Sequence, residues 1–113
     1  VYKLAHTLID AGADVIFGHG PHVTRAIEVY KDRFIAYSLG NFCTFGGMNV
    51  SGPNGWAPII NVHTTRQGAF LKAHITATWQ MPRSPVKMDA EKRVIKRIQQ
   101  LTKEDFPEST LQI

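Results

Sequence analysis

Residues 14–23 read Asp-Val-Ile-Phe-Gly-His-Gly-Pro-His-Val, an apolar run that ends abruptly in glycine, proline and two histidines. Its apolar part, residues 15–17, is bounded by turn formers, a pattern typical of a strand buried on both faces. A loop with two imidazoles therefore starts at the carboxyl end of a strand, where ligands bind in open α/β sheets. The glycine permits a positive φ and the proline fixes its own, so His19 and His22 could face one ion.

Spacing alone leaves two interpretations open for these histidines. Imidazole is a common metal ligand, but a histidine in a loop is more often simply solvated. The other histidines suggest no site: His63 and His74 fall in alternating segments, where we interpret them as structural, and we expect His6 at the surface.

Periodicity predicts an α/β chain. An amphipathic helix over residues 2–11 has Leu4, Leu8 and Ala11 on its apolar stripe and ends at a glycine. After residue 17 the sequence predicts a first hairpin of 25–30 and 34–39 and an irregular loop over 40–55. A second hairpin of 57–64 and 69–79 follows, in which the odd-numbered residues from 69 to 79 face the core. A connector over 81–88 then leads to a helix that is capped by Asp89 and has Val94, Ile98 and Leu101 on its apolar face.

The helix at the start lacks the strand that precedes it in a βαβ unit, and no initiator methionine is present. We therefore expect residues 1–113 to be the C-terminal portion of a single domain, with 88–113 as its last helix and tail. The strand at 15–17 would then have an unpaired edge, through which the isolated chain is expected to form a homo-oligomer.

Charge and cysteine content set further limits. The net charge of +4 is concentrated in residues 83–103, which hold seven Lys/Arg against two acids, a local charge of +5. This segment could attract a polyanion, but it also matches the solvated side of an amphipathic helix, which is the interpretation that we favour. Cys43 is the only cysteine, so an internal disulfide is excluded and a buried apolar role is expected.

The longer run over residues 14–42, DVIFGHGPHVTRAIEVYKDRFIAYSLGNF, closely resembles the bacterial capsule-synthesis CapA family, also called PGA_cap or PgsA and associated with poly-γ-glutamate. In that family an apolar strand leads into a glycine and Pro-His-Val, followed by a hairpin and a Tyr-Ser-Leu-Gly-Asn-Phe segment. The resemblance extends from about residue 4 to about residue 62.

CapA-like proteins belong with the calcineurin-like metallophosphoesterases, so the resemblance implies a layered α/β/β/α fold with two metal ions held at strand ends. His22 matches the last histidine of that superfamily's Gly-His-x-His motif, and His19 is the candidate for the other, although the spacing here is one residue longer. Asn41 matches a family position near the cleft, where it could bond substrate or a metal-bound water, but an asparagine after glycine is equally a turn residue. The upstream ligands of the family have no counterpart in these residues, so the divalent ions (Mn, Zn or Fe) would be completed by ligands outside this chain.

Two functions from different classes remain open. One is a metal-dependent hydrolase or transferase acting on a phosphoester or on an acidic polymer such as poly-γ-glutamate, with the isolated chain inactive. The other is a non-catalytic envelope component that binds or guides a polyanionic polymer. The resemblance implies a location in the bacterial cell envelope, with membrane association only through parts not present here, and no nucleic-acid partner is expected.

Overall fold

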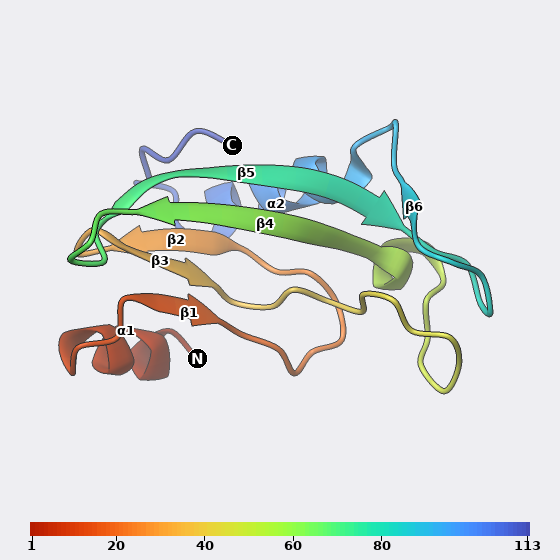
Figure 1. The fold of residues 1–113 in the computed structure, drawn as a ribbon, viewed down its shortest axis with the longest axis horizontal. Helices are drawn as coiled ribbons and strands as arrows, with labels where there is room; N and C mark the ends of the chain where they lie inside the picture. Colours follow the sequence, from red (N-terminus) through yellow and green to blue (C-terminus); the bar gives the residue numbers. More distant parts are fainter.

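The computed structural model describes residues 1–113 as two α-helices and two three-stranded sheets (Figure 1), which confirms the α/β class and both predicted hairpins. In chain order the elements are α1 (Tyr2–Asp10), β1 (Val15–Phe17), β2 (Ile27–Tyr30), β3 (Arg33–Ala36), the 3₁₀ helix η1 (Gly52–Gly55), β4 (Trp56–Thr64), β5 (Phe70–Trp79), β6 (Lys87–Met88) and α2 (Arg93–Asp105). The short β6 lies in the segment predicted as a connector. Neither α-helix has the length and apolar character needed to span a bilayer.

The first sheet has the order β1-β3-β2, with β1 parallel and β2 antiparallel to the central β3. Lys31 and Asp32 connect β2 to β3, and both have left-handed backbone angles, with φ of 49° and 62°. Two consecutive residues with positive φ are what a type I′ turn requires, and this turn matches the twist of the strands it joins. The hairpin therefore forms without the glycine that usually occupies such a turn.

The prediction that β1 is buried on both faces is wrong for these residues. Val15 and Ile16 are half-buried, and the Phe17 side chain is 49% exposed. The reason is that β1 lies at the edge of its sheet and has β3 as its single strand partner. An apolar run therefore forms an edge strand here, with one unpaired side.

Helix α1 packs on the first sheet through a different face from the one predicted. Its buried residues are Ala5 and Ile9, which contact the β3 side of the sheet, whereas Leu4 and Leu8 are 65% and 44% exposed. This rotation also moves His6 from the predicted surface position over β2. There its ring stacks on Tyr30 with centroids 3.7 Å apart, and its Nε2 lies 2.8 Å from a Glu28 carboxylate oxygen.

The second sheet pairs β4 with β5 and ends in β6. The pairing shifts by one residue between His63 and Thr64, because Leu71 has no partner on β4 and forms a β-bulge. A bulge reverses the alternation of side chains beyond it. Phe70 therefore packs on Phe34 in the core, with ring centroids 5.6 Å apart, whereas Leu71, predicted to face the core, is exposed.

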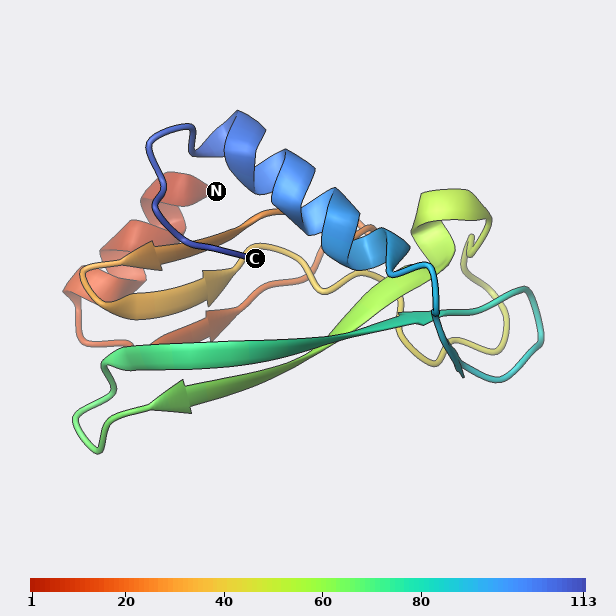
Figure 2. The same cartoon turned by 90° about the horizontal axis from the view of Figure 1, so that it is seen from above.

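One hydrophobic core joins both sheets and α2. Its buried residues come from β2, β3, β5 and α2: Ile27, Phe34, Ala36, Ala77, Val94 and Ile98. Figure 2 shows α2 running beside both sheets, and the Thr102 hydroxyl accepts a hydrogen bond from Ile27 N–H at 3.2 Å. Helix α2 therefore covers the outer edge of β2, while the outer edge of β1 stays open.

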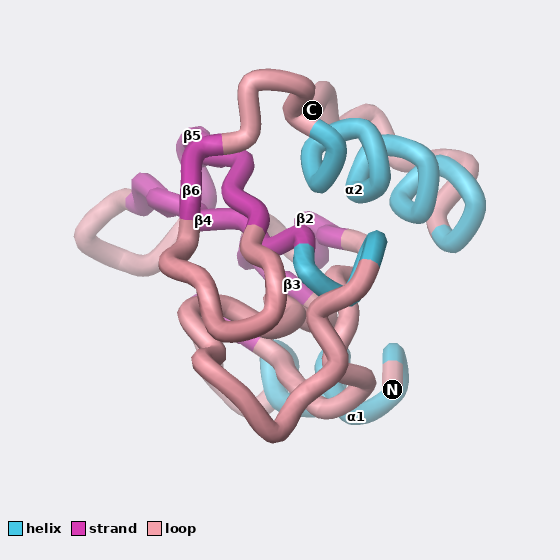
Figure 3. The backbone as a smooth tube through the Cα atoms, turned by 90° about the vertical axis from the view of Figure 1, so that its right-hand side faces the viewer, coloured by secondary structure: helices cyan, strands magenta, loops and turns pink.

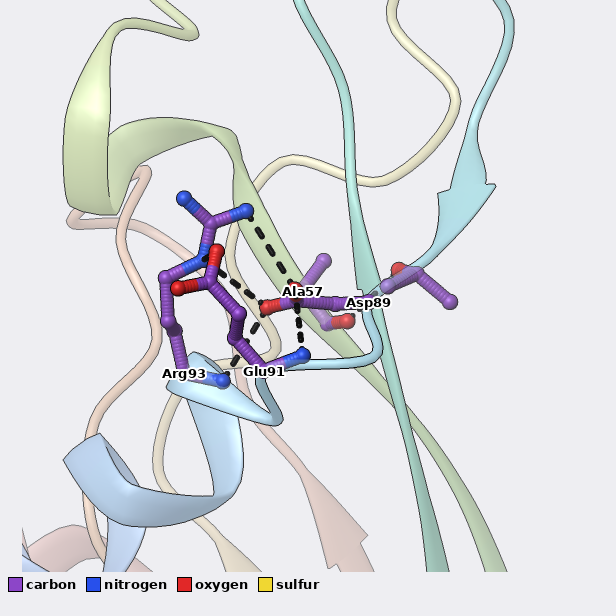
Figure 4. Close-up of polar contacts among 5 residues, drawn as sticks. Ala57, Asp89, Glu91 and Arg93 are labelled. Atoms are coloured by element: carbon purple, nitrogen blue, oxygen red, sulfur yellow. Dashed lines mark hydrogen bonds and ion pairs between the residues drawn. The ribbon is translucent and has the colours of Figure 1, made fainter.

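The start of α2 is held by a buried ion pair (Figure 4). The Asp89 carboxylate accepts hydrogen bonds from the backbone and guanidinium of Arg93, each at 3.0 Å, and from Glu91 N–H at 3.2 Å. The Arg93 guanidinium also lies over the rings of Trp79 and Trp56, 5.0 and 5.4 Å from their centroids. Asp89 thus holds the turn that leads into α2, but the prediction that it is the N-cap is wrong, because the helix begins at Arg93 and its N-cap residue is Lys92.

This ion pair predicts an acid-sensitive contribution to stability. Burial by itself would raise the pKa of Asp89, but its hydrogen bonds from Arg93 and Glu91 outweigh burial and lower that pKa. A carboxylate with a lowered folded-state pKa stabilises the fold above its unfolded pKa of about 4, and loses this effect as the pH falls through the folded-state value. We expect Asp89→Asn to reduce the free energy of unfolding by about 2 kcal/mol near pH 7, and by much less near pH 3.

Urea unfolding at both pH values measures this difference. Glu91→Gln is the matched control, because its exposed carboxylate lies 3.8 Å from Arg93 and should contribute less than about 0.5 kcal/mol. Equal stability of wild type and Asp89→Asn near pH 7 would contradict the assignment.

Candidate functional site

His19, His22 and Asn41 line one open cavity of about 590 Å³. The cavity lies between the loop after β1, the segment that follows β3, and the first half of β4. Figure 3 shows the backbone from the end of the molecule at which the loops that follow β1 and β3 lie. The structure therefore brings all three predicted site residues together at the carboxyl end of β1.

Gly18 sets the point at which the chain leaves β1. Its N–H continues the parallel pairing by donating to Ala36 O at 2.7 Å, and its carbonyl accepts from Leu39 N–H at 3.1 Å. A Cβ at this position would lie 2.5 Å from Tyr37 O, so no other residue fits without moving the backbone. This close approach directs the next residues, including His19, away from the sheet and toward the cavity.

Asn41 is 4% exposed and holds three segments together. Its side-chain amide N–H₂ donates to the carbonyls of His22 at 2.9 Å, Asn49 at 3.0 Å and Asn54 at 3.4 Å. Three surrounding carbonyls identify this atom as the amide nitrogen, since only a donor satisfies them. The Asn41 side-chain oxygen then faces His22 Nδ1 at 3.3 Å.

This contact orients His22. An amide oxygen can only accept, so the neutral imidazole carries its proton on Nδ1 and leaves a lone pair on Nε2. The residue is exposed, and its φ of 60° lies in the left-handed region. His22 is therefore presented as a metal ligand usually is, with one nitrogen held by a neighbour and the other free.

The cavity does not contain a complete metal site. Its lining includes His19 and His22 but no Asp, Glu or Cys, and no group of three or more such ligands occurs in the chain. Catalytic metal ions normally have at least three protein ligands. His19 and His22 thus fit part of a metal site. His63 and His74, for which the sequence suggests no site, do not line this cavity.

Two features of the site region were missed from the sequence. Cys43 is exposed rather than buried; it lies in the irregular loop after β3 and has a left-handed φ of 57°. The cavity rim is apolar: Phe17, Phe42, Met48 and Ile59 each line it and are each more than two-fifths exposed. No periodicity marks these rim residues, since they come from a strand end, a loop and a sheet edge.

Residues 2–45 match the family model described as "Bacterial capsule synthesis protein PGA_cap". The matched segment runs from α1 through the histidine loop and Asn41.

Relatives named for capsule or PGA biosynthesis match parts of this chain. The capsule biosynthesis protein CapA of Bacillus anthracis is 59% identical over 39 residues, which is 34% of this chain and 10% of the relative. The PGA biosynthesis protein CapA of Bacillus subtilis is 41% identical over 73 residues, 65% of this chain and 16% of the relative. An uncharacterized protein of Sinorhizobium fredii is 69% identical over 39 residues, 34% of this chain and 8% of the relative. The matched parts of the chain thus cover between 8% and 16% of these relatives.

The amide network of Asn41 predicts an order of stability between two variants. Asn41→Asp replaces the donor by an oxygen that faces three carbonyls, and we expect it to lose about 3 kcal/mol of unfolding free energy. Asn41→Ala removes the donor without adding a repulsive oxygen, so we expect a smaller loss of about 1–2 kcal/mol. Urea unfolding at neutral pH measures both; an Asp variant as stable as the Ala variant would contradict the network.

Proposed function

We propose that this chain supplies part of the substrate-facing site of a capsule or poly-γ-glutamate biosynthesis protein of the bacterial cell envelope. The observation that carries the proposal is the convergence of His19, His22 and Asn41 on one cavity, in a segment that matches the capsule-synthesis family. The names of the two Bacillus relatives, a capsule and a PGA biosynthesis protein, support this biological process.

For the chemistry, we propose a metallophosphoesterase-like, metal-dependent hydrolase or transferase. His22, and His19 beside it, would bind a divalent ion (Mn, Zn or Fe) together with ligands from outside these 113 residues. Such an ion polarises a substrate oxygen and lowers the pKa of water. Asn41 would act as a positioning residue, because its oxygen holds His22 Nδ1 while its amide group is occupied by three carbonyls.

The cavity lining supports an anionic substrate only in combination with the ion. It has no carboxylate that would repel a phosphoester or an acidic polymer, but it also has no Lys or Arg that would neutralise one. The positive charge that such a substrate needs would therefore come from the bound metal.

A second candidate is a non-catalytic component that binds or guides a polyanionic polymer. Two observations favour it: the chain has no group of three metal ligands, and residues 83–103 carry a local charge of +5 from seven Lys/Arg and two acids. The two candidates differ in whether bound metal is required.

The deciding experiment uses a longer protein that contains this chain. We expect His22→Asn to remove bound metal and metal-dependent hydrolysis while changing the unfolding free energy by less than about 1 kcal/mol, because His22 is exposed and asparagine tolerates a positive φ. Elemental analysis and hydrolysis of a phosphoester and of poly-γ-glutamate provide the measurements. The isolated chain should bind no divalent ion tightly and should be inactive.

His74→Asn is the matched control, because His74 is also exposed but lies on β5 outside the cavity. This control should keep both metal and activity. Unchanged metal content in the His22 variant would reject the ligand assignment, whereas a wild-type protein free of metal that still binds poly-γ-glutamate would favour the second candidate.

A further inference from the structure

Two loops lie side by side at one end of the molecule, next to the cavity. The first loop covers residues 40–50 and the second covers residues 81–86; Arg83 N–H donates to Phe45 O at 3.1 Å, and the side chain of Gln80 bonds the backbone of Thr44. Both loops are at the right-hand end of Figure 1 and at the same end of Figure 2. They therefore form one continuous surface although they are distant in the sequence.

This surface is unusually apolar for an exposed one. The Phe45 side chain is 73% exposed, and Met81 and Met48 are about half exposed on the same two loops. Met88, on the adjoining β6, is 72% exposed. Single exposed apolar residues are common, but a group of large ones at one end of a small domain usually marks an interaction site.

The charged residues of these two loops and of β6 are all cationic. Residues 40–56 and 80–88 contain no Asp or Glu, but they contain the exposed Arg83 and Lys87. The nearest acids in the sequence are Asp89 and Glu91, and both lie beside the Arg93 guanidinium (Figure 4). We call Phe45, Met48, Met81, Arg83 and Lys87 the loop face.

We propose that the loop face binds the surface of an anionic lipid bilayer. Large apolar side chains at loop tips can enter the boundary between head groups and acyl chains. Lys and Arg beside them gain from the negative potential of anionic head groups, whereas an acid at the same depth would be repelled. An apolar surface that has cations and lacks acids fits this partner better than it fits a water-soluble polyanion, which has no apolar phase to receive Phe45 and Met81.

The sequence predicted membrane association only through parts outside these residues, and the loop face adds a route within them. It would place the opening of the cavity near the lipid surface, because Met48 belongs to both the cavity rim and the loop face. The inference does not depend on the proposed metal chemistry, since Phe45, Met81, Arg83 and Lys87 do not line the cavity.

Flotation of the 113-residue chain with vesicles provides the test. Vesicles of phosphatidylcholine with phosphatidylglycerol are compared with vesicles of phosphatidylcholine alone, at low and at high salt. We expect binding to the phosphatidylglycerol vesicles that weakens with salt. The double variant Phe45→Ser/Met81→Ser and the double variant Arg83→Glu/Lys87→Glu should each reduce the partition coefficient by about tenfold or more.

Matched controls come from the opposite parts of the chain. Leu4→Ser/Leu71→Ser removes two comparably exposed apolar side chains, and Arg66→Glu/Lys72→Glu makes the same change of net charge on exposed residues. Both controls should bind like wild type, and circular dichroism checks that all variants are folded.

Three results would overturn the proposal. The first is absence of vesicle binding by the folded wild type. The second is an equal loss of binding in the controls and in the loop-face variants. The third is concentration-dependent self-association that disappears in Phe45→Ser/Met81→Ser without any lipid binding, which would identify the loop face as a contact between copies of this chain.

Discussion

The parallel pairing of β1 with β3 is the interaction on which the other features depend. It continues one residue beyond β1, where Gly18 lies so close to the backbone of Tyr37 that a side chain could not be accommodated. Because the two strands are parallel, the loops that follow them leave the sheet at the same edge. The histidine loop and the segment that carries Asn41 are therefore neighbours, although 19 residues separate His22 from Asn41.

The central position of β3 makes this arrangement rigid. Phe34, Ile35 and Ala36 are completely buried, because one face of β3 packs on α1 and the other faces the core shared with β5 and α2. Interiors are packed too densely to allow such a strand to move independently. The end of β3 is therefore a fixed platform, and from it Asn41 reaches carbonyls on three segments.

Local patterns were sufficient to predict most elements but not how they pack. The α2 face of Val94, Ile98 and Leu101 was correct, because a single amphipathic helix with one apolar stripe has one way to bury it. The α1 face was wrong, since Leu4 and Ala5 both belong to apolar stripes and only the sheet decides between them. The position of the bulge at Leu71 was equally hidden, because register depends on the partner strand.

For the site, the shared cavity of His19 and His22 followed from a stiff loop at a strand end. The role of Asn41 did not, because its three carbonyl partners are set by tertiary structure.

The structure places the basic residues of one sequence segment in different environments. The local charge of +5 over residues 83–103 suggests one basic surface, but the structure divides it. Arg93 forms an ion pair with the buried Asp89. Arg83, in the loop before β6, and Lys87, on β6, lie beside exposed apolar residues. Lys96 and Lys103 are exposed on α2, and Lys92 is exposed at its N-cap. The cavity lining contains no Asp, Glu, Lys or Arg side chain. The cations of residues 83–103 thus lie outside the cavity lining, so they cannot neutralise an anion inside the cavity.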